Sequence, residues 1–131
     1  APSSISWSEE NRIPLIQLLY SPGRDASIEF RSADAYCNPY ITFQMLLSAG
    51  MAGIQNQEEL SDTMNAANDA SASRMLPHSL LESIDLARNS AFVHSVLPEA
   101  LIRDFSAAME EEVRAYQQAK DPQAFCFDQY F

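Results

Sequence analysis

The residues of this 131-residue chain best suited to chemistry are Glu29 and Arg31, which lie two positions apart in the segment SIEFR. The segment alternates as a β-strand does, so Ile28 and Phe30 share one face while Glu29 and Arg31 share the other. The pattern therefore predicts one packed face and one face where an acid lies beside a base within reach of a substrate. By itself, an acid–base pair of this kind is usually a solvated strand face.

A capped helix is predicted to follow this strand after a short loop. Asn38 is a good N-cap and Pro39 suits the first helical position, so the helix should run from about Pro39 to Gln55. Gly50 and Gly53 lower its stability, and we expect them to allow close packing against a neighbouring backbone. The expected apolar stripe consists of Ile41, Met45, Leu46, Ala49 and Ala52.

A β-hairpin is predicted before the helix. Residues 1–10 are polar and serine-rich and predict a loop, whereas Asn11–Tyr20 has strand character. Pro14 cannot donate a ladder hydrogen bond, which places it at an edge or a bulge, and Ser21–Ala26 forms the turn. A two-stranded hairpin is marginal alone, so either helices cover it or sheet partners come from another segment, and we favour the second alternative.

The rest of the chain is predicted to be mainly helical. Ser79 and Glu82 have the spacing of a capping box that opens a helix ending at Arg88. Residues 90–96 extend that helix or turn, and Pro98 begins a long helix that ends near Lys120. A short helix over 57–66 is possible within an otherwise loop-like polar stretch, and the tail aromatics Phe125, Phe127 and Tyr130 should be docked.

Composition limits the class of protein. The predicted fold class is α+β, with a loop and short hairpin (1–37) followed by a mainly helical region (38–131). The length suits one domain. A net charge of −10 and a pI near 4.4 exclude a basic nucleic-acid footprint. The apolar run Ile41–Ile54 is too short to span a membrane, and no signal-peptide pattern is visible.

The two cysteines and the first residue leave alternatives open. Cys37 and Cys126 are expected to be reduced, half-buried thiols of a cytosolic protein, although one disulfide is also compatible with the sequence. The chain begins with Ala1, which admits a processed start, a trimmed tag or a fragment.

Three stretches together resemble the C-terminal part of the catalytic domain of type I glutamine synthetase. IEFRSAD…NPY followed by MLLSAGMAGI is similar to that family's I-E-[FV]-R-x-x-D…N-P-Y element and the helix after it. The opening WSEENRIPLIQLL resembles W-[GS]-x-x-N-R-S-x-L-I-R-I-P, and the tail FCFDQYF resembles the family's end. Members of the family join glutamate to ammonia through γ-glutamyl phosphate, using ATP and Mg²⁺ or Mn²⁺, and they assemble as cytoplasmic rings of identical subunits.

The resemblance implies roles for four residues. Glu29 matches the carboxylate that ligates the metal bridging the ATP phosphates, a hard oxygen ligand suited to Mg²⁺ or Mn²⁺. Arg31 and Arg12 match arginines that hold glutamate and the transferring phosphate, and both are catalytic candidates. Arg12 and Arg24 are the candidates for contacting ATP.

Departures from the family pattern bear on activity. Gln17 and Ser27 stand where the family has two phosphate-side arginines, and Ile13 and Leu19 replace a serine and a proline of the same motif. Loss of one charge-assisted phosphate contact costs roughly 2 kcal/mol, so losing two predicts weak ATP binding, a changed substrate or no catalysis. The tyrosine that some bacterial members adenylylate has no counterpart, which argues against that mode of regulation.

The other candidate groups have structural explanations. His78 and His94 lie outside any matching motif and are expected to be structural or solvated. Glu29 is then the one candidate metal ligand, and a single carboxylate cannot complete a metal site. The methionines fill core or loop, Glu110–Glu112 is a solvated helix face, and Trp7 is a packing anchor or an adenine contact.

Several functional classes stay open on the sequence. The chain is expected to be a piece of a glutamine synthetase-like ligase that is inactive alone. The alternatives are a degenerate homologue with a binding or assembly role, a γ-glutamyl-amine ligase, or an unrelated acidic helical domain. If the hairpin has no partner, exposed strand edges should cause self-association.

Overall fold

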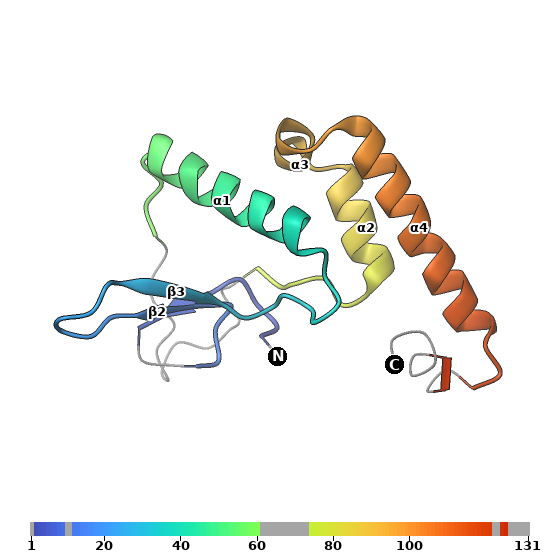
Figure 1. The fold of residues 1–131 in the computed structure, drawn as a ribbon, viewed down its shortest axis with the longest axis horizontal. Coiled ribbons are helices and arrows are strands. Elements are labelled where there is room, and N and C mark those ends of the chain that lie inside the picture. The colour runs from blue at the N-terminus through green and yellow to red at the C-terminus, as the bar shows by residue number, and fades with distance from the viewer. Residues whose placement is uncertain (1, 10–11, 61–73, 122–123, 126–131) are drawn as a thin grey trace. The chain divides into compact units, whose positions relative to one another are not determined.

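The computed structural model describes residues 2–9, 12–60, 74–121 and 124–125. They form an α+β fold in which a small sheet and one helix come first and three helices follow (Figure 1). The chain divides into two compact units, residues 1–76 and 77–131. The predicted fold class is therefore confirmed. No helix of the described residues is long and apolar enough to cross a membrane.

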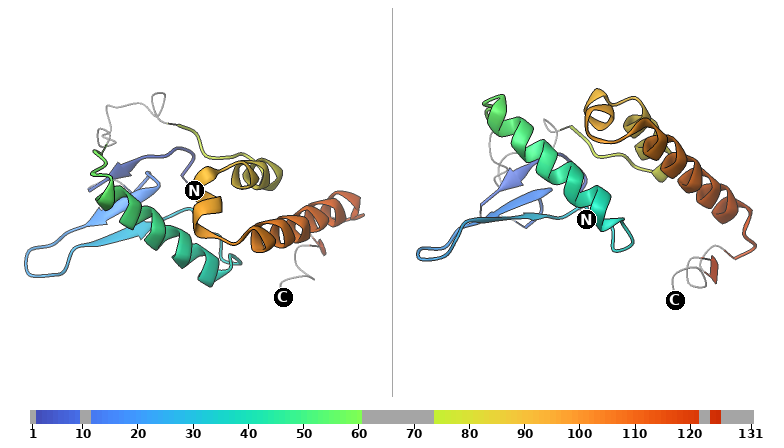
Figure 2. Two further views of the ribbon diagram at one scale, coloured as in Figure 1. Left: turned by 90° about the horizontal axis from the view of Figure 1, so that it is seen from above. Right: turned by 45° about the horizontal axis from the view of Figure 1, so that its top comes forward.

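The first unit contains a three-stranded sheet in the order β1-β2-β3. Strands β2 (Ile16–Leu19) and β3 (Ser27–Phe30) form the predicted antiparallel hairpin, seen in blue in Figures 1 and 2. Strand β1 (Trp7–Ser8) pairs in parallel with β2. The prediction that residues 1–10 form only a loop is wrong, because two of them supply the third strand. The serine-rich composition of this segment does not indicate a strand, because Trp7 and Ser8 become a strand only by pairing with β2.

Pro14 and Leu15 lie buried just before β2 rather than within it. The predicted strand over Asn11–Tyr20 is therefore too long at its beginning, and β2 is the central strand of the sheet. The expectation that Pro14 marks an edge or a bulge is wrong. A proline ahead of the strand leaves every ladder donor of β2 intact, so a central position is allowed.

The end of the first unit is tied back to its beginning. The Ile5 N–H donates to the Arg74 carbonyl over 2.7 Å, and the Leu76 N–H donates to the Ser3 carbonyl over 2.9 Å. Ser4 and Met75 thereby form an antiparallel bridge. The bridge continues the backbone pairing of this unit beyond the sheet, and Ser4 is buried there.

Helix α1 (Pro39–Gln55) begins and ends where the sequence predicts. The Asn38 side chain accepts hydrogen bonds from the N–H groups of Tyr40 and Ile41, which confirms the N-cap. A Cβ atom added at Gly50 or Gly53 would meet nothing within 4 Å. The close backbone approach expected at these glycines is therefore wrong for the described part of this chain.

In the second unit, α2 (Leu80–Arg88) packs against α4 (Glu99–Gln118) and also contacts α3 (Ala91–Val96). Ser79 caps α2 by accepting from the Glu82 N–H at 3.2 Å, as predicted, and α4 begins one residue after Pro98. Ile84 of α2 and Ile102 of α4 are its buried apolar side chains among the described residues. Residues 90–96 form a separate helix, since Ser90 provides a new N-cap.

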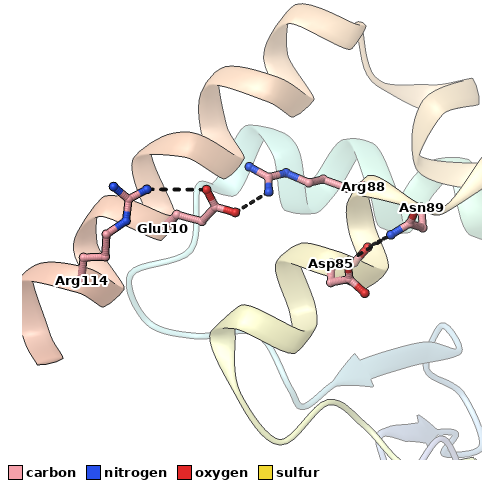
Figure 3. A network of polar contacts seen from close by, with 5 residues as sticks. All are labelled: Asp85, Arg88, Asn89, Glu110 and Arg114. Atoms are coloured by element: carbon pink, nitrogen blue, oxygen red, sulfur yellow. Dashed lines mark hydrogen bonds and ion pairs between the residues drawn. The ribbon is translucent and has the colours of Figure 1, made fainter.

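One ion pair joins α4 to α2, and a second joins successive turns of α4 (Figure 3). Arg88 of α2 reaches Glu110 of α4, and this contact lowers the pKa of the Glu110 carboxyl below its ordinary value. Arg114, one turn further along α4, lies 3.8 Å from the same carboxylate. At the end of α2, the Asn89 amide donates to Asp85 at 3.2 Å. Glu110 therefore has a partner on another helix, whereas Glu111 is on the solvated face that was predicted and pairs with Arg114 of its own helix at 3.2 Å.

Of the tail aromatics, only Phe125 lies within the described residues. Its ring meets that of Tyr116 edge-to-face with 6.2 Å between centroids, so the docking predicted for it is confirmed. Phe127, Tyr130 and Cys126 lie outside the described residues. Of the short helix predicted over 57–66, only residues 57–60 are described, and they are not helical. Cys37 is a half-buried free thiol, as expected.

Candidate functional site

The candidate site is one face of the sheet in the first unit. In the β2–β3 pair, Gln17 lies directly opposite Glu29, and in the β1–β2 pair Ser8 lies beside Gln17. Residues paired across neighbouring strands point to the same face. Ser8, Gln17 and Glu29 therefore form a row across all three strands, and Trp7, Ile16 and Phe30 form the matching row on the other face.

Arg31 extends this row beyond the end of β3. It is two residues from Glu29, and its backbone N–H still donates to the Leu15 carbonyl at 3.0 Å, which keeps its side chain on the Glu29 face. The Arg31 Nε lies 3.6 Å from the Glu29 Oε1. The acid beside a base that the alternation predicts is thus present. An ion pair this long and partly solvated contributes little stability, so both groups are available for other partners.

Gln17 is the polar residue of β2 and is buried, with 5% of its surface exposed. Its Oε1 is buried and accepts no hydrogen bond, and the Arg31 Nη1 is buried and donates none. One unpaired acceptor and one unpaired donor thus occur on the same sheet face, on either side of Glu29. Buried polar atoms in native proteins nearly always have partners, so this face has unused hydrogen-bonding capacity.

Ser27, the second departure from the family pattern, lies on the same face. It pairs with Leu19, two positions from the Gln17–Glu29 pair, and it is exposed. Both positions at which the resemblance predicts arginine are thus next to Glu29, and both are neutral here. Glu29 and Arg31 are the charged members among the described residues of this row, and their charges cancel.

The other two predicted cations lie outside the row. Arg24 is in the turn between β2 and β3, where its N–H donates to the Ser21 carbonyl at 3.0 Å and Gly23 supplies the positive φ of 82°. Arg12 lies in the bend before Pro14 and is exposed. Within the described residues, neither guanidinium forms an ion pair. The structure therefore brings together Glu29 and Arg31 but not Arg12 or Arg24.

A shallow depression of about 590 Å³ lies at the turn end of the hairpin, away from Glu29. Its lining is mostly apolar. None of the four predicted site residues contributes to it; it is formed by Glu9, Leu18, Leu19, Tyr20, Ala26, Ser27 and Ile28. Apart from Ser27, it shares no residue with the row around Glu29, so we do not assign the candidate chemistry to it.

The described residues do not complete a metal site. No group of three or more His, Cys, Asp or Glu side chains among them could hold a metal ion. Glu29 offers one carboxylate of the type that Mg²⁺ and Mn²⁺ prefer, but one carboxylate does not hold a divalent ion against water.

His94 has a structural role in the second unit. Its Nε2 lies 2.8 Å from the Arg88 carbonyl and its Nδ1 lies 2.8 Å from Glu99. The bond to the Arg88 carbonyl, followed by the Glu99 carboxylate, raises the pKa of the imidazole above its ordinary value. These contacts join the end of α2 to the start of α4, which is a structural role of the kind predicted for His94.

A family model described as the catalytic domain of glutamine synthetase matches residues 1–128. The chain belongs to the glutamine synthetase catalytic-domain family. The resemblance found in the sequence is thereby confirmed over nearly the whole chain, and the alternative of an unrelated acidic helical domain is excluded.

Three curated relatives show how much of a glutamine synthetase this chain represents. It is 34% identical to the glutamine synthetase of Methanosarcina mazei over 130 residues, which is 93% of this chain and 29% of that protein. It is 31% identical to that of Mycolicibacterium smegmatis, over 93% of this chain and 30% of the relative. For the Thermotoga maritima protein the identity is 29%, over 88% of this chain and 28% of the relative. The chain thus spans less than a third of the glutamine synthetases it matches.

Two features of this glutamine synthetase-like sheet were missed in the sequence. The strand β1 was missed because two residues are too few for any periodicity. The position of Gln17 opposite Glu29 was missed because strand register depends on the turn, and the turn residues SPGRDA do not specify one turn type. Once the register is known, the two neutral replacements and the metal-ligand candidate fall on one face.

Proposed function

We propose that this chain is the C-terminal part of the catalytic domain of a glutamine synthetase-like ligase. The observation that carries the proposal is the exposed Glu29 beside Arg31 on one face of the sheet, in a chain that belongs to this family. In the whole enzyme, glutamate, ammonia and ATP would be the substrates, and glutamine would form through γ-glutamyl phosphate. The cytoplasm and a ring of identical subunits are the location and assembly we infer for it.

Each candidate residue has a distinct role in the proposal. Glu29 would supply one carboxylate to a Mg²⁺ or Mn²⁺ ion, which neutralises phosphate charge when bound, and the remaining ligands would come from polypeptide outside this chain. Arg31 would hold the substrate carboxylate or the transferring phosphate, since a guanidinium can donate two parallel hydrogen bonds to such a group. Arg12 would act beside it, and both Arg12 and Arg24 would contact ATP.

The chain alone is expected to be inactive, because the described residues offer one carboxylate where a metal site needs several. The direct test is a chimera in which this chain replaces the matching segment of the Methanosarcina mazei glutamine synthetase, to which it is 34% identical. Glutamine formed from glutamate, ammonia and ATP is measured by amino-acid analysis. We expect the chimera to be active and the isolated chain to be inactive.

Substitutions in the chimera test the assigned site. Glu29→Gln should lower the rate by roughly 100-fold or more, because it removes a charged metal ligand. Glu111→Gln, a change of the same kind on the solvated face of α4, should leave the rate unchanged. Equal rates for both variants would remove Glu29 from the site.

A second candidate, a degenerate homologue that binds or assembles without catalysis, is favoured by the neutral Gln17 and Ser27 beside Glu29. On that reading the chimera is inactive, and restoring both cations with Gln17→Arg and Ser27→Arg recovers the activity. If the unmodified chimera is active with an amine but not with ammonia, the protein is instead a γ-glutamyl-amine ligase.

A further inference from the structure

The imidazole ring of His94 is held between two acceptors. Its Nε2 lies 2.8 Å from the carbonyl oxygen of Arg88, and its Nδ1 lies 2.8 Å from a carboxylate oxygen of Glu99. A neutral imidazole has one N–H group and one lone pair, whereas the imidazolium has two N–H groups. A lone pair on either nitrogen would face an oxygen lone pair at 2.8 Å, so the two contacts together require the doubly protonated ring.

These two contacts span the junction between α3 and α4, where α3 also lies beside the end of α2 (Figure 1). Leu97 and Pro98, the two residues between α3 and α4, are extended, with ψ angles of 142° and 140°. The Arg88 carbonyl is at the end of α2, where carbonyls lack donors from their own helix. His94 thus ties the end of α2 and the start of α4 to α3 across a link of two residues. Short links at the ends of helices are the usual hinges of proteins.

The charges around the ring are supplied by α2 and α4. Helix α3 carries His94 as its one ionisable side chain. The charged groups linked to the ring, directly or through one another, are Glu99, Arg103, Asp104, Arg88 and Glu110. Of these side chains, Glu99 is the one that contacts the ring, since the guanidinium of Arg88 is paired with Glu110.

We propose that His94 is a proton-dependent switch at the junction of α3 and α4. In the imidazolium form both contacts are made and the junction is closed. When the ring loses one proton to solvent, the remaining proton stays on Nε2, because the Arg88 carbonyl is fixed in the backbone whereas the Glu99 side chain is 75% exposed and can turn into water. Nδ1 then presents a lone pair to Glu99, and that carboxylate leaves the ring and turns toward Arg103, four residues further along α4.

The switch acts locally and within this chain. Every group that makes or breaks a contact with the ring lies between residues 88 and 99, so no polypeptide outside the chain is needed. Ile84 and Ile102 bury apolar surface where α2 packs with α4, and this burial does not depend on the charge of His94. Deprotonation therefore loosens α3 and its link to α4 while the pair of longer helices persists.

Histidine titrates in the range where cellular pH can act on it. The hydrogen bond to the Arg88 carbonyl, followed by the Glu99 carboxylate, raises the pKa of His94 above its ordinary value of 6.5. The closed form is therefore complete below that value, and the junction opens as pH rises through the folded pKa.

Nitrogen NMR of the histidine rings in the full chain tests the proposal directly. Nitrogen chemical shifts distinguish the imidazolium from each of the two neutral tautomers. Over a series from about pH 5.5 to 9, which brackets histidine titration, we expect His94 to change from the doubly protonated ring to the Nε2–H tautomer. The midpoint should lie above 6.5.

Glu99→Gln tests the partner of the ring. It removes the carboxylate and keeps the size of the side chain, so the pKa of His94 should fall relative to that in the unmodified chain. Glu111→Gln makes the same change on the solvated face of α4 and should leave the pKa of His94 as it is.

Amide hydrogen exchange tests the opening of the junction. The Leu97 N–H donates to the Val93 carbonyl and the Leu101 N–H donates to the Pro98 carbonyl, so these two amides flank the link. After correction for the intrinsic effect of pH on exchange, their protection should fall roughly 2- to 5-fold as His94 loses its proton, the range typical of one exposed ion pair. Glu99→Gln should abolish this fall, whereas Glu111→Gln should preserve it.

Three results would overturn the proposal. They are a neutral ring with its proton on Nδ1, a pKa of His94 that Glu99→Gln does not move, and constant protection of the Leu97 and Leu101 amides through the titration. The tautomer is measured on the unmodified chain, so the first result is decisive even if a substitution alters folding. The inference does not depend on the ligase function, because the state of the ring and the activity of the chimera are measured separately.

Discussion

Gln17 of the central strand lies directly opposite Glu29 of the edge strand, and the Gln17 Oε1 is buried without a hydrogen-bond donor. A neutral amide thus occupies the position nearest the carboxylate that we propose as a metal ligand. The Gln17 carbonyl should therefore lower the stability of the fold, because a buried acceptor without a donor loses its hydration without compensation.

Gln17→Met should therefore stabilise the first unit. The substitution keeps the size of the side chain and removes the unpaired carbonyl, so the free energy of unfolding should rise by about 1 kcal/mol. Urea unfolding followed by the fluorescence of Trp7, which lies on the adjacent strand β1, is the measurement. Gln17→Asn keeps the amide and serves as the control. A fall in stability for Gln17→Met would show that the amide has a partner in solution.

The second unit should lose stability as pH rises through the titration of His94. His94 has a folded pKa above its ordinary value of 6.5, so its protonated form is the stabilising one. That contribution is complete below the unfolded pKa and disappears as pH rises through the folded pKa. Urea midpoints from about pH 5.5 to 8.5, a range that brackets histidine titration, should fall for the unmodified chain. His94→Gln should flatten this dependence, whereas His78→Gln should preserve it.

Acid should weaken the same unit through a different group. The pKa of Glu110 is lowered by Arg88, so the Glu110 carboxylate stabilises the fold above the ordinary glutamate value of 4.5. The stability is lost as pH falls through the lowered folded pKa. Glu110→Gln should reduce the drop in the urea midpoint on acidification. Glu111→Gln, on the solvated side of α4, is the matched control and should leave that drop unchanged.

Ser79→Ala should destabilise α2 by about 1 kcal/mol, because the Ser79 hydroxyl accepts from the Glu82 N–H at 3.2 Å at the start of the helix. Hydrogen exchange of the first amides of α2 reports the effect locally. Ser83→Ala removes a hydroxyl that only donates to the Ser79 carbonyl, so it should change the exchange less. Equal effects of the two substitutions would contradict the capping role.

Ile102→Ala should cost about 2 kcal/mol or more, since it removes most of a side chain that is buried where α4 packs with α2. Leu101→Ala, at the neighbouring exposed position, should cost markedly less. Thermal unfolding by circular dichroism compares the two. A cost for Leu101→Ala as large as that for Ile102→Ala would mean that α4 presents a different face to α2.

The sequence by itself determined the helices and the composition of the site. The bounds of α1 and the caps at Asn38 and Ser79 follow from local rules, because each depends on a side chain and backbone groups within three residues of it. The acid–base face of β3 follows from alternation alone. Family membership was also readable, since its motifs are contiguous in the chain.

Only the tertiary structure decided which residues share the Glu29 face. The pairing of Gln17 with Glu29, the addition of β1, and the central position of β2 all depend on strand pairing and register, which are set by hydrogen bonds between strands and by the turn conformation rather than by the residue pattern within one strand. The exposure of apolar side chains of α1 such as Phe43 and Leu47 was likewise not predictable, because apolar residues all round a helix predict burial.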